Sequence, residues 1–479
     1  MRQETRHMQD HTPEQIDTAV STAAAAADNW ARSGAETRAA LLRGLADGLQ
    51  AERETLVPLA DAETALGTAR LNGELDRTTF QLRGFADQVL AGAPFTMTDD
   101  AAVAGPPPAG RPRLTRVRVA VGPVAMFAAS NFPFAFSVLG GDTASALAAG
   151  CPVVVKAHPG HPELSRAVAA LAQRVVAAQG LPAGLFGMVE GASVAVGVQL
   201  VRHPLVAAVA FTGSYRGGAA LQREANERPR PIPFYGELGS INPVVALPAA
   251  LAANGAALAA TLAGSITLGC GQFCTSPGVL IVHDDDASKA FVQQLAEALG
   301  AATPHAMLHA GIRAGFDAGV ARLQQHAGVQ ALAAPEHGPT APRARLFATD
   351  AATFVESEAL HEEVFGPSCL VVTVRSLDDT LDVLRAVQGS LTVTLWGADA
   401  DTADNRRLVR AAEGIAGRVL FAGVPTGVAV TAAQQHGGPW PASTQPFTTS
   451  VGYAAMDRFL RPVALQDAPD WLVAARGQA

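Results

Sequence analysis

Apolar residues recur at helical spacing through the first part of the chain. Pro13–Ala31 shows this pattern, with Thr12 placed as an N-cap and Pro13 at the first helical position. The same spacing predicts three more helices, over Thr37–Leu49, Glu52–Leu66 and Leu71–Leu90. Arg113–Val121 then alternates charged and apolar residues, which predicts a half-exposed strand outside the main core.

From about residue 121 the pattern changes to short apolar runs separated by helical segments. The expected strands are Val124–Ala129, Val153–Val155, Leu185–Val189, Val206–Phe211 and Pro243–Leu247. The expected helices between them are Gly140–Ala149, Pro162–Gln179, Ser193–Arg202 and Arg216–Asn226. This alternation indicates a doubly wound parallel sheet, which binds ligands at the carboxyl ends of its strands.

A second α/β block is expected over about residues 249–431. Its strands are predicted at Val279–Val282, Cys369–Val374, Leu391–Leu395 and Arg418–Phe421. Its helices are predicted at Ala287–Leu299, Leu377–Val387 and Asn405–Ala412. The fold class is therefore α/β, with two doubly wound domains.

Composition narrows the possible partners and compartment. The net charge is −8 and no segment is rich in Lys or Arg, so we expect no nucleic-acid partner. The polar N-terminus lacks a secretory signal, and the four cysteines fit neither a disulfide framework nor a zinc site, so we expect a cytoplasmic protein without a metal. The charge-free stretch Leu238–Val282 is rich in Ala and Gly, which favours a buried helix over a membrane span.

Two residues stand out as candidates for chemistry. Cys274, in the sequence GQFCT, lies toward the end of the charge-free stretch, where a helix gives way to a loop. A partly exposed thiol there suits a nucleophile, although a buried structural cysteine is the alternative. Glu237 is isolated in an apolar stretch, where burial would raise its pKa and suit a general base. A core carboxylate that caps a helix or pairs with arginine is the alternative.

Further polar residues follow predicted strands. Asn131, in SNFP, could donate to an oxyanion or form an Asx turn. Gly213 and Ser214, in FTGSYRGG, could hold a pyrophosphate at a helix N-terminus, although this is not the G-x-G-x-x-G fingerprint. Glu363, in EEVFGP, could bind ribose hydroxyls or lie in a solvated turn, and Lys156 could meet ribose or phosphate or lie exposed at a strand end.

Taken in order, SNFP, VVVKAHP, FTGS, GELG, GQFCT and EEVFGP resemble the aldehyde dehydrogenase superfamily over essentially the whole chain. The resemblance implies that Cys274 is the nucleophile and Glu237 the general base. It also implies that Asn131 and the Cys274 backbone N–H hold the oxyanion. An aldehyde would then be oxidised through a thiohemiacetal and a thioester to a carboxylic acid.

The resemblance also implies cofactor contacts. Lys156 matches the adenosine-ribose contact, and Ser214 with Gly213 matches the pyrophosphate contact. Glu363 matches the nicotinamide-ribose carboxylate, and Phe365 the aromatic residue beside it.

One position bears on the choice of nucleotide. Strictly NAD-dependent members often carry a glutamate at the position of Pro159, which here is flanked by His158 and His161. We therefore expect NADP or NAD, with NADP at least accepted and His158 near it. Phe132, beside Asn131, is expected near the substrate.

Four segments look closest to α-ketoglutaric semialdehyde (2,5-dioxovalerate) dehydrogenases and related NADP-accepting enzymes. They are Leu75–Ala86, Lys156–Pro162, Arg418–Val428 and His436–Ala442. The expected substrate is α-ketoglutaric semialdehyde, with another aliphatic or aromatic aldehyde as the alternative. A CoA-acylating dehydrogenase and a catalytically silent binding protein on the same fold are further alternatives.

The resemblance implies three parts. Residues 1–112 with 122–237 would form the cofactor-binding domain, and 238–436 the catalytic domain. Residues 113–121 with 437–479 would form a small oligomerisation sheet. An exposed alternating strand is an edge that invites pairing, so we expect a homodimer or homotetramer.

Overall fold

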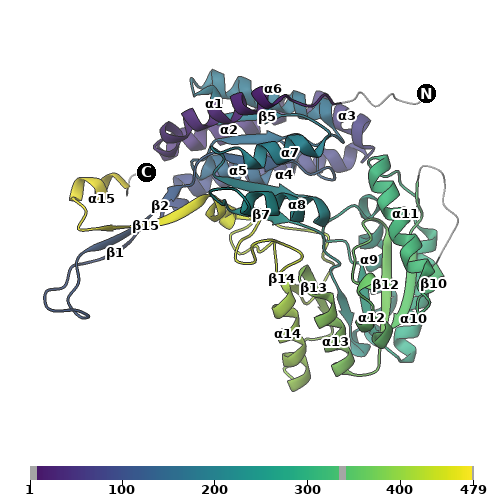
Figure 1. Cartoon of the computed structure of the whole chain (residues 1–479). Coiled ribbons are helices and arrows are strands. Elements are labelled where there is room, and N and C mark those ends of the chain that lie inside the picture. Colours follow the sequence, from purple (N-terminus) through teal and green to yellow (C-terminus); the bar gives the residue numbers. More distant parts are fainter. Residues whose placement is uncertain (1–7, 334–340, 477–479) are drawn as a thin grey trace.

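The computed structural model describes residues 8–333 and 341–476 of the chain. Two α/β units lie side by side, and a small sheet projects from the first (Figure 1). The first unit begins with four helices, α1 (Pro13–Ala31), α2 (Ala35–Ala51), α3 (Arg53–Thr64) and α4 (Thr68–Leu90). Thr12 caps α1 as predicted, because its side chain accepts a hydrogen bond from the Gln15 N–H in a capping box.

The first sheet has five parallel strands in the order β5-β4-β3-β6-β7. They are β3 (Val124–Phe127), β4 (Val153–Lys156), β5 (Phe186–Val189), β6 (Ala208–Thr212) and β7 (Phe234–Glu237). Helices α1, α7 (Val194–Arg202) and α8 (Tyr215–Asn226) pack on one face. Helices α2, α4, α5 (Gly141–Ala148) and α6 (Pro162–Ala178) pack on the other. Because all five strands are parallel, the residues that follow them share one edge of the sheet.

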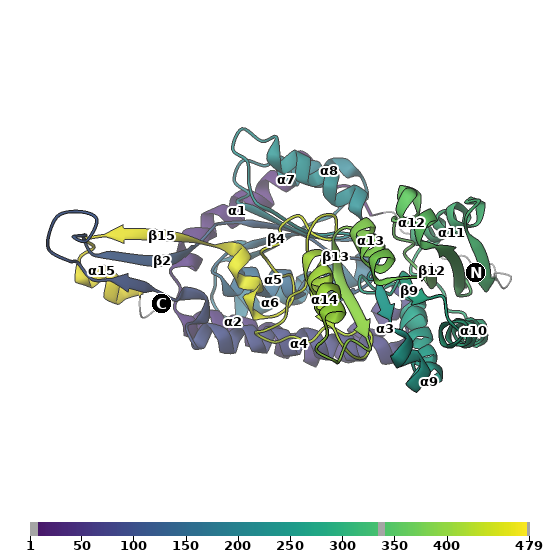
Figure 2. The same cartoon turned by 90° about the horizontal axis from the view of Figure 1, so that it is seen from below.

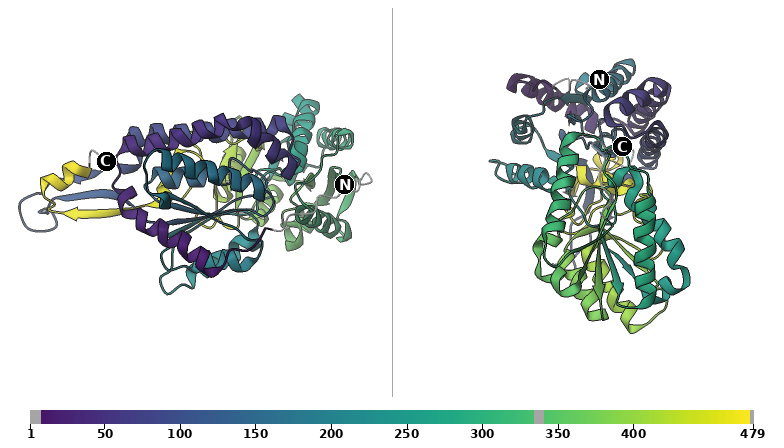
Figure 3. Two further views of the ribbon diagram at one scale, coloured as in Figure 1. Left: turned by 90° about the horizontal axis from the view of Figure 1, so that it is seen from above. Right: turned by 90° about the vertical axis from the view of Figure 1, so that its right-hand side faces the viewer.

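The second sheet has seven strands in the order β10-β11-β12-β9-β8-β13-β14, with β10 antiparallel and the others parallel. They are β8 (Val244–Ala246), β9 (Val279–His283), β10 (Gln330–Ala333), β11 (Arg345–Asp350), β12 (Ser368–Val374), β13 (Ser390–Trp396) and β14 (Ala416–Leu420). Helices cover both faces of this sheet (Figure 3). They are α9 (Pro248–Thr267), α10 (Asp286–Ala301), α11 (Ala310–Gln325), α12 (Ala351–Glu356), α13 (Leu377–Val387) and α14 (Ala403–Ile415).

One expected strand was assigned to the wrong sheet, and β7 was among the strands that were not expected. The run around Val244 was placed with the first sheet, but β8 pairs with β9 and β13 of the second. Strand β7 was not predicted, because its sequence Phe-Tyr-Gly-Glu has no apolar run, and it completes the first sheet beside β6. Strand pairing is a long-range property, so the local pattern gave a strand at β8 without its partner.

The third sheet is antiparallel, in the order β1-β2-β15, and projects from the molecule (Figure 2). It comprises β1 (Thr98–Asp100), β2 (Leu114–Ala120) and β15 (Leu460–Gln466), and α15 (Asp470–Arg476) follows it. The register runs from Leu114 opposite Gln466 to Ala120 opposite Leu460. The predicted strand therefore does pair with the C-terminal tail.

Helix α9 lies in the charge-free stretch. Within it, Pro248–Gly271 is long and apolar enough to cross a membrane by length and composition alone. Leu251, Leu262 and Ile266 are buried in the core of the second unit together with residues of α10. Its exposed positions are mostly alanine, so the outer face is only weakly apolar.

Candidate active site

Cys274 follows an irregular turn after α9. A short 3-10 segment, Leu268–Gly271, leads from the helix to the cysteine, and three of its residues have positive φ. A Cβ atom on Gly271 would lie 2.3 Å from the carbonyl carbon of Gly366, so only glycine fits there. This turn leaves Cys274 half-buried, whereas Cys151, Cys270 and Cys369 are buried.

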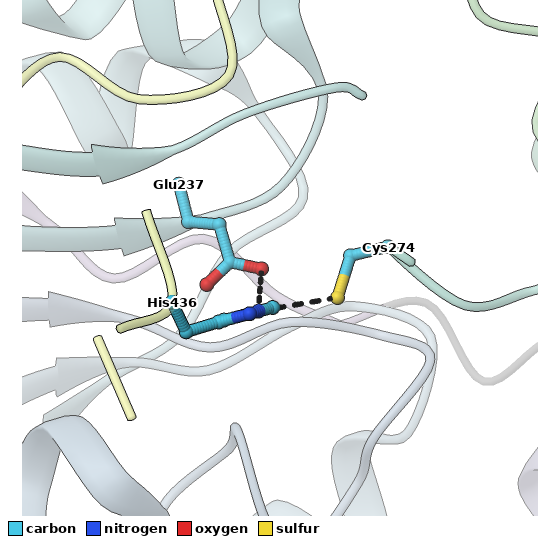
Figure 4. Close-up of side chains that lie close together, drawn as sticks. All are labelled: Glu237, Cys274 and His436. Atoms are coloured by element: carbon cyan, nitrogen blue, oxygen red, sulfur yellow. Dashed lines mark hydrogen bonds and ion pairs between the residues drawn. The ribbon is translucent and has the colours of Figure 1, made fainter. Parts of the chain in front are cut away.

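Three side chains from distant parts of the chain meet at Cys274 (Figure 4). The Cys274 Sγ lies 3.5 Å from the His436 Nε2, which lies 3.0 Å from the Glu237 Oε1. The Ser450 hydroxyl donates to the Glu237 Oε2 at 2.5 Å. Glu237 ends β7, Cys274 follows α9, and His436 lies after β14. Both Glu237 and His436 are buried, so their contacts are shielded from water.

The C-terminal segment brings His436 and Ser450 to Glu237. After β14 the chain returns to the first unit and runs beside β7, where the Leu238 N–H donates to the Ala442 carbonyl. The Thr444 N–H donates to the Gly236 carbonyl. The site therefore forms only when both α/β units and this segment are in place.

The environment of Glu237 differs from the sequence-based expectation. Burial alone raises the pKa of the carboxyl, but the charge and hydrogen bond of His436 and the Ser450 hydrogen bond outweigh it. The net pKa is below the ordinary value, so the predicted upward shift was wrong. The reason is that Glu237 is not isolated once the C-terminal segment has packed beside it.

The pKa of the Cys274 thiol is shifted in the opposite direction, upward. Burial, and then the adjacent charge and hydrogen bond of Glu237, raise the pKa of Cys274 well above its ordinary value. The resting residue is therefore a thiol, and it becomes a nucleophile only by passing its proton to a neighbour. Glu237 and His436 are both close enough to receive it.

Asn131 is held beside the cysteine loop. Its side-chain amide donates to the Gln272 carbonyl at 3.1 Å. The Arg70 Nη2, on α4, donates to the Asn131 carbonyl at 2.6 Å. Glu74, one turn further along α4, accepts hydrogen bonds from the Phe134 and Ala135 N–H groups. Helix α4 thus fixes the loop that carries Asn131.

The proposed nucleotide contacts lie at the carboxyl edge of the first sheet. Lys156 ends β4, and burial lowers the pKa of its ammonium to about 8. Ser214 caps α8 and accepts from the Gly217 N–H at 3.3 Å, and Gly213 beside it is exposed. An exposed helix N-terminus with a lysine at a neighbouring strand end suits a dinucleotide phosphate, so these residues fit that group.

His158 packs among other histidines. Its ring centroid lies 5.8 Å from that of His161 and 5.9 Å from that of His309, and its Nδ1 accepts from the Gly160 N–H. Burial, reinforced by these neighbours, keeps the pKa of His158 well below its ordinary value, so the ring is neutral at pH 7. His309 is the N-cap of α11, a helix of the second unit. The contacts of His158 therefore belong to the packing between the two units.

Glu363 and Phe365 lie in the turn before β12. Burial raises the pKa of Glu363 to about 8, although its carboxyl also accepts a hydrogen bond from the Ser240 backbone. The charge of Glu363 raises the pKa of Cys274, so the turn that carries Glu363 lies near the nucleophile. Phe365 is half-buried and lines a small cavity with Glu363 and Ser240.

Phe132 lies in an aromatic group next to Asn131. Its ring centroid lies 5.3 Å from that of Phe136 and 5.1 Å from that of Phe273, and both pairs are edge-on. Phe273 directly precedes Cys274, and both aromatic rings are half-buried. An apolar wall of this kind borders the thiol.

Sequence reasoning missed His436, Ser450, Arg70 and Glu74. His436 lies in a segment that was noted for its resemblance to one subfamily, but nothing local indicated a role at the thiol. Cysteine, histidine and glutamate are also zinc ligands, and the donor atoms of Cys274, His436 and Glu237 lie within 4.8 Å of one another. The His436–Glu237 hydrogen bond already uses two of those atoms, so proton transfer accounts for the arrangement.

A thiol beside a buried carboxylate, at the carboxyl edge of a doubly wound sheet, defines the site of an enzyme with a cysteine nucleophile. The aldehyde dehydrogenase family model matches residues 2–438, and the chain belongs to this family. It is an aldehyde-oxidising enzyme that uses NAD(P)⁺.

Two relatives are similar over nearly the whole chain. Alpha-ketoglutaric semialdehyde dehydrogenase 2 of Azospirillum brasilense is 45% identical, over 96% of this chain and 88% of the relative. Alpha-ketoglutaric semialdehyde dehydrogenase of Acinetobacter baylyi is 39% identical, over 95% and 87%. Among solved structures, proline utilization A from Bradyrhizobium japonicum superposes with a TM-score of 0.79 at 24% identity. The superposition covers 96% of this chain and 46% of that longer protein, so the chain spans about half of it.

Proposed function

We propose that this enzyme oxidises α-ketoglutaric semialdehyde to 2-oxoglutarate, in a soluble cytoplasmic form. The observation that carries the proposal is the contact of Cys274 with His436 and Glu237, in a chain that is 45% identical to an enzyme named for this substrate. A second relative at 39% identity has the same named substrate. Another aliphatic or aromatic aldehyde is the alternative.

The proposed chemistry begins with proton transfer. The Cys274 thiol gives its proton to the Glu237–His436 pair, and the sulfur attacks the aldehyde carbon. The Asn131 amide, together with the Cys274 N–H, stabilises the oxyanion of the thiohemiacetal. Bound NAD(P)⁺ supplies the hydride acceptor, which leaves an acyl thioester on Cys274. Once the first proton has passed from the pair to solvent, Glu237 takes a proton from water and the resulting hydroxyl adds to the thioester carbon. The C–S bond then breaks, Glu237 returns its proton to the leaving thiolate, and the acid and the thiol are released.

The residues that we propose for nucleotide binding are Lys156, Gly213, Ser214, Glu363 and Phe365, with His158 behind Lys156. We propose that NADP is accepted as well as NAD, since Pro159 offers no carboxylate to repel a 2′-phosphate. Glu190, at the end of the neighbouring strand, is paired with Arg166 at 2.6 Å, which limits its repulsion.

Replacing the nucleophile tests the reaction. Cys274→Ala should abolish NAD(P)H formation from α-ketoglutaric semialdehyde, because no thiohemiacetal can form. Absorbance at the nicotinamide band, with each nucleotide and a panel of aldehydes, gives the rate and the substrate preference. Cys151→Ala is the matched control, since that thiol is buried and donates to the Phe459 carbonyl.

Three outcomes would contradict parts of the proposal. Retained oxidation in the Cys274→Ala variant would remove Cys274 from the mechanism. A strict requirement for coenzyme A would favour the acylating alternative, in which a thiol replaces water. A clear preference of the wild-type enzyme for another aldehyde would remove the proposed substrate.

A further inference from the structure

Two arginines lie near the Cys274 thiol and have no role in the chemistry described above. Arg77 lies on α4, and Arg418 lies on β14. The Arg77 Nη1 donates to the Val428 carbonyl. The Arg418 Nη1 and Nη2 donate to the carbonyls of Gly427 and Pro425, both at 2.6 Å. Both guanidinium groups are therefore anchored on one short loop, residues 425–428.

Each guanidinium keeps donors that no protein acceptor uses. Within residues 8–333 and 341–476, the Arg77 Nε and Nη2 and the Arg418 Nε are shielded from solvent and lack a hydrogen-bond acceptor. Buried polar groups are nearly always hydrogen-bonded, so such orphans need an explanation such as a bound ligand. The Nε and Nη2 of one arginine form the planar fork that matches a carboxylate.

The positive charge near the thiol is also incompletely balanced. Burial lowers the pKa of Arg77, and negative charge at Cys274, Glu74 and Glu237 opposes the shift. Glu74 is a weak counter-charge, because burial raises its pKa to about 7 and its Oε1 is committed to the Phe134 and Ala135 N–H groups. Cys274 also interacts with the charge of Arg418. An anion bound beside these two arginines would complete the balance.

Aromatic side chains pack beside the Arg77 guanidinium group. The Arg77 guanidinium carbon lies 5.9 Å from the centroid of the Phe136 ring, which packs against Phe132. Arg77, Arg418, Phe132 and Cys274 are all half-buried, and Gly427 on the loop is exposed. The lining thus combines an apolar wall with cationic groups on one side, as expected for a short aliphatic chain with a charged end.

We propose that Arg77, with Arg418 beside it, binds the carboxylate at the remote end of the substrate and selects for aldehydes that carry one. This inference rests on the proposed function, and it names the residues that recognise the acid group. Arg77 would supply the bidentate contact, and Arg418 would hold the loop and add charge. Selectivity would arise because a neutral substrate leaves the buried donors unpaired.

The test compares two substrates of equal length, 5-oxopentanoate and pentanal, in wild type, Arg77→Met, Arg77→Lys and Arg83→Met. Arg83 lies on the same helix but is exposed and paired with Asp47, so it is the matched control. We expect Arg77→Met to lower the ratio of the two kcat/KM values by about 100-fold. The ratio for Arg77→Lys should lie between those of wild type and Arg77→Met, because lysine keeps the charge but lacks the planar fork. Arg83→Met should keep the wild-type ratio.

A binding measurement provides a second readout. Glutarate, the product of 5-oxopentanoate oxidation, should bind about 100-fold more weakly to Arg77→Met than to wild type by calorimetry. An equal loss of activity on both aldehydes, or unchanged glutarate binding in a folded variant, would overturn the carboxylate role. Wild-type enzyme that oxidises no aldehyde would instead defeat the proposed function, and glutarate binding would still decide the role of Arg77.

Discussion

At the scale of single residues, the chemistry depends on how Glu237 and Cys274 shift each other's pKa. His436 and Ser450 keep Glu237 ionised, and that charge in turn raises the pKa of the neighbouring thiol. At rest the pair therefore holds one proton on sulfur, and transfer of that proton to the carboxylate is unfavourable until attack on the aldehyde consumes the thiolate. The same carboxylate is then free to serve water after hydride transfer, so its two proposed tasks occur at different stages.

Glu237→Gln separates these stages. We expect the first turnover still to yield a burst of NAD(P)H, because His436 contacts the thiol and can take its proton. The steady-state rate should fall by about 100-fold, because water attack on the thioester loses its base. Stopped-flow absorbance measures both phases. Glu358→Gln, at an exposed carboxylate, should leave both unchanged. An unaltered steady-state rate in Glu237→Gln would exclude Glu237 as the base for hydrolysis.

At the scale of elements, α4 does more than cover the sheet. Leu75, Leu82 and Phe85 on its apolar face are buried. Glu74 and Arg77, about one turn apart, contact the loop that follows Asn131: Glu74 accepts from the Phe134 N–H, and Arg77 lies beside the Phe136 ring. A helix in this position couples the oxyanion loop to the proposed carboxylate site through one rigid element.

The burial of Glu74 predicts a pH-dependent stability. Burial raises its pKa to about 7, so the folded protein takes up a proton between about pH 4.5 and 7 and becomes less stable as the pH rises through that window. Between pH 5 and 8 the loss from this group should be about 3 kcal/mol, at 1.36 kcal/mol per pKa unit. Glu74→Gln keeps an acceptor for Phe134 and Ala135 and should remove that loss.

Urea unfolding followed by circular dichroism at both pH values measures this difference. Glu36→Gln, at an exposed position on α2, is the control and should behave as wild type. The same pH dependence in wild type and Glu74→Gln would show that Glu74 is ionised throughout.

At the scale of the whole molecule, the projecting sheet is largely open to solvent, since all three residues of β1 are exposed and exposed residues recur along β15. β15 lies at its edge, and Trp471 on the following helix is 71% exposed. An open strand edge beside an exposed aromatic side chain is typical of an interface between subunits. We propose that the enzyme is a homodimer or a dimer of dimers, joined through this sheet.

Trp471→Glu tests this assembly. A charge at that position should weaken the oligomer, because it would have to be buried without a partner. Sedimentation velocity should show a shift toward smaller species at a given concentration. Val355→Glu, at an exposed apolar position on α12, should not shift it. A monomeric wild-type protein, or no change in the Trp471→Glu variant, would contradict the proposal.

Much of the architecture could be predicted from the sequence alone, because helices and strands depend on the spacing of apolar residues over short stretches of chain. Helical spacing gave α1 within the observed bounds, and continuous apolar runs gave β3 and β4. Ordered motifs gave Cys274, Glu237 and Asn131, and the structure places them around one loop junction. These features depend on neighbours within a few turns or on residues that stand in a recognisable order.

Only the tertiary structure decided which distant groups meet. His436 reaches Glu237 across 199 positions of sequence, and its contact reverses the expected direction of the pKa shift. The same holds for Arg77, which meets the carbonyl of Val428 across 351 positions, and for β8, whose partners lie in the second sheet. Charge balance and strand pairing depend on distances in space, and the local pattern carries no record of those distances.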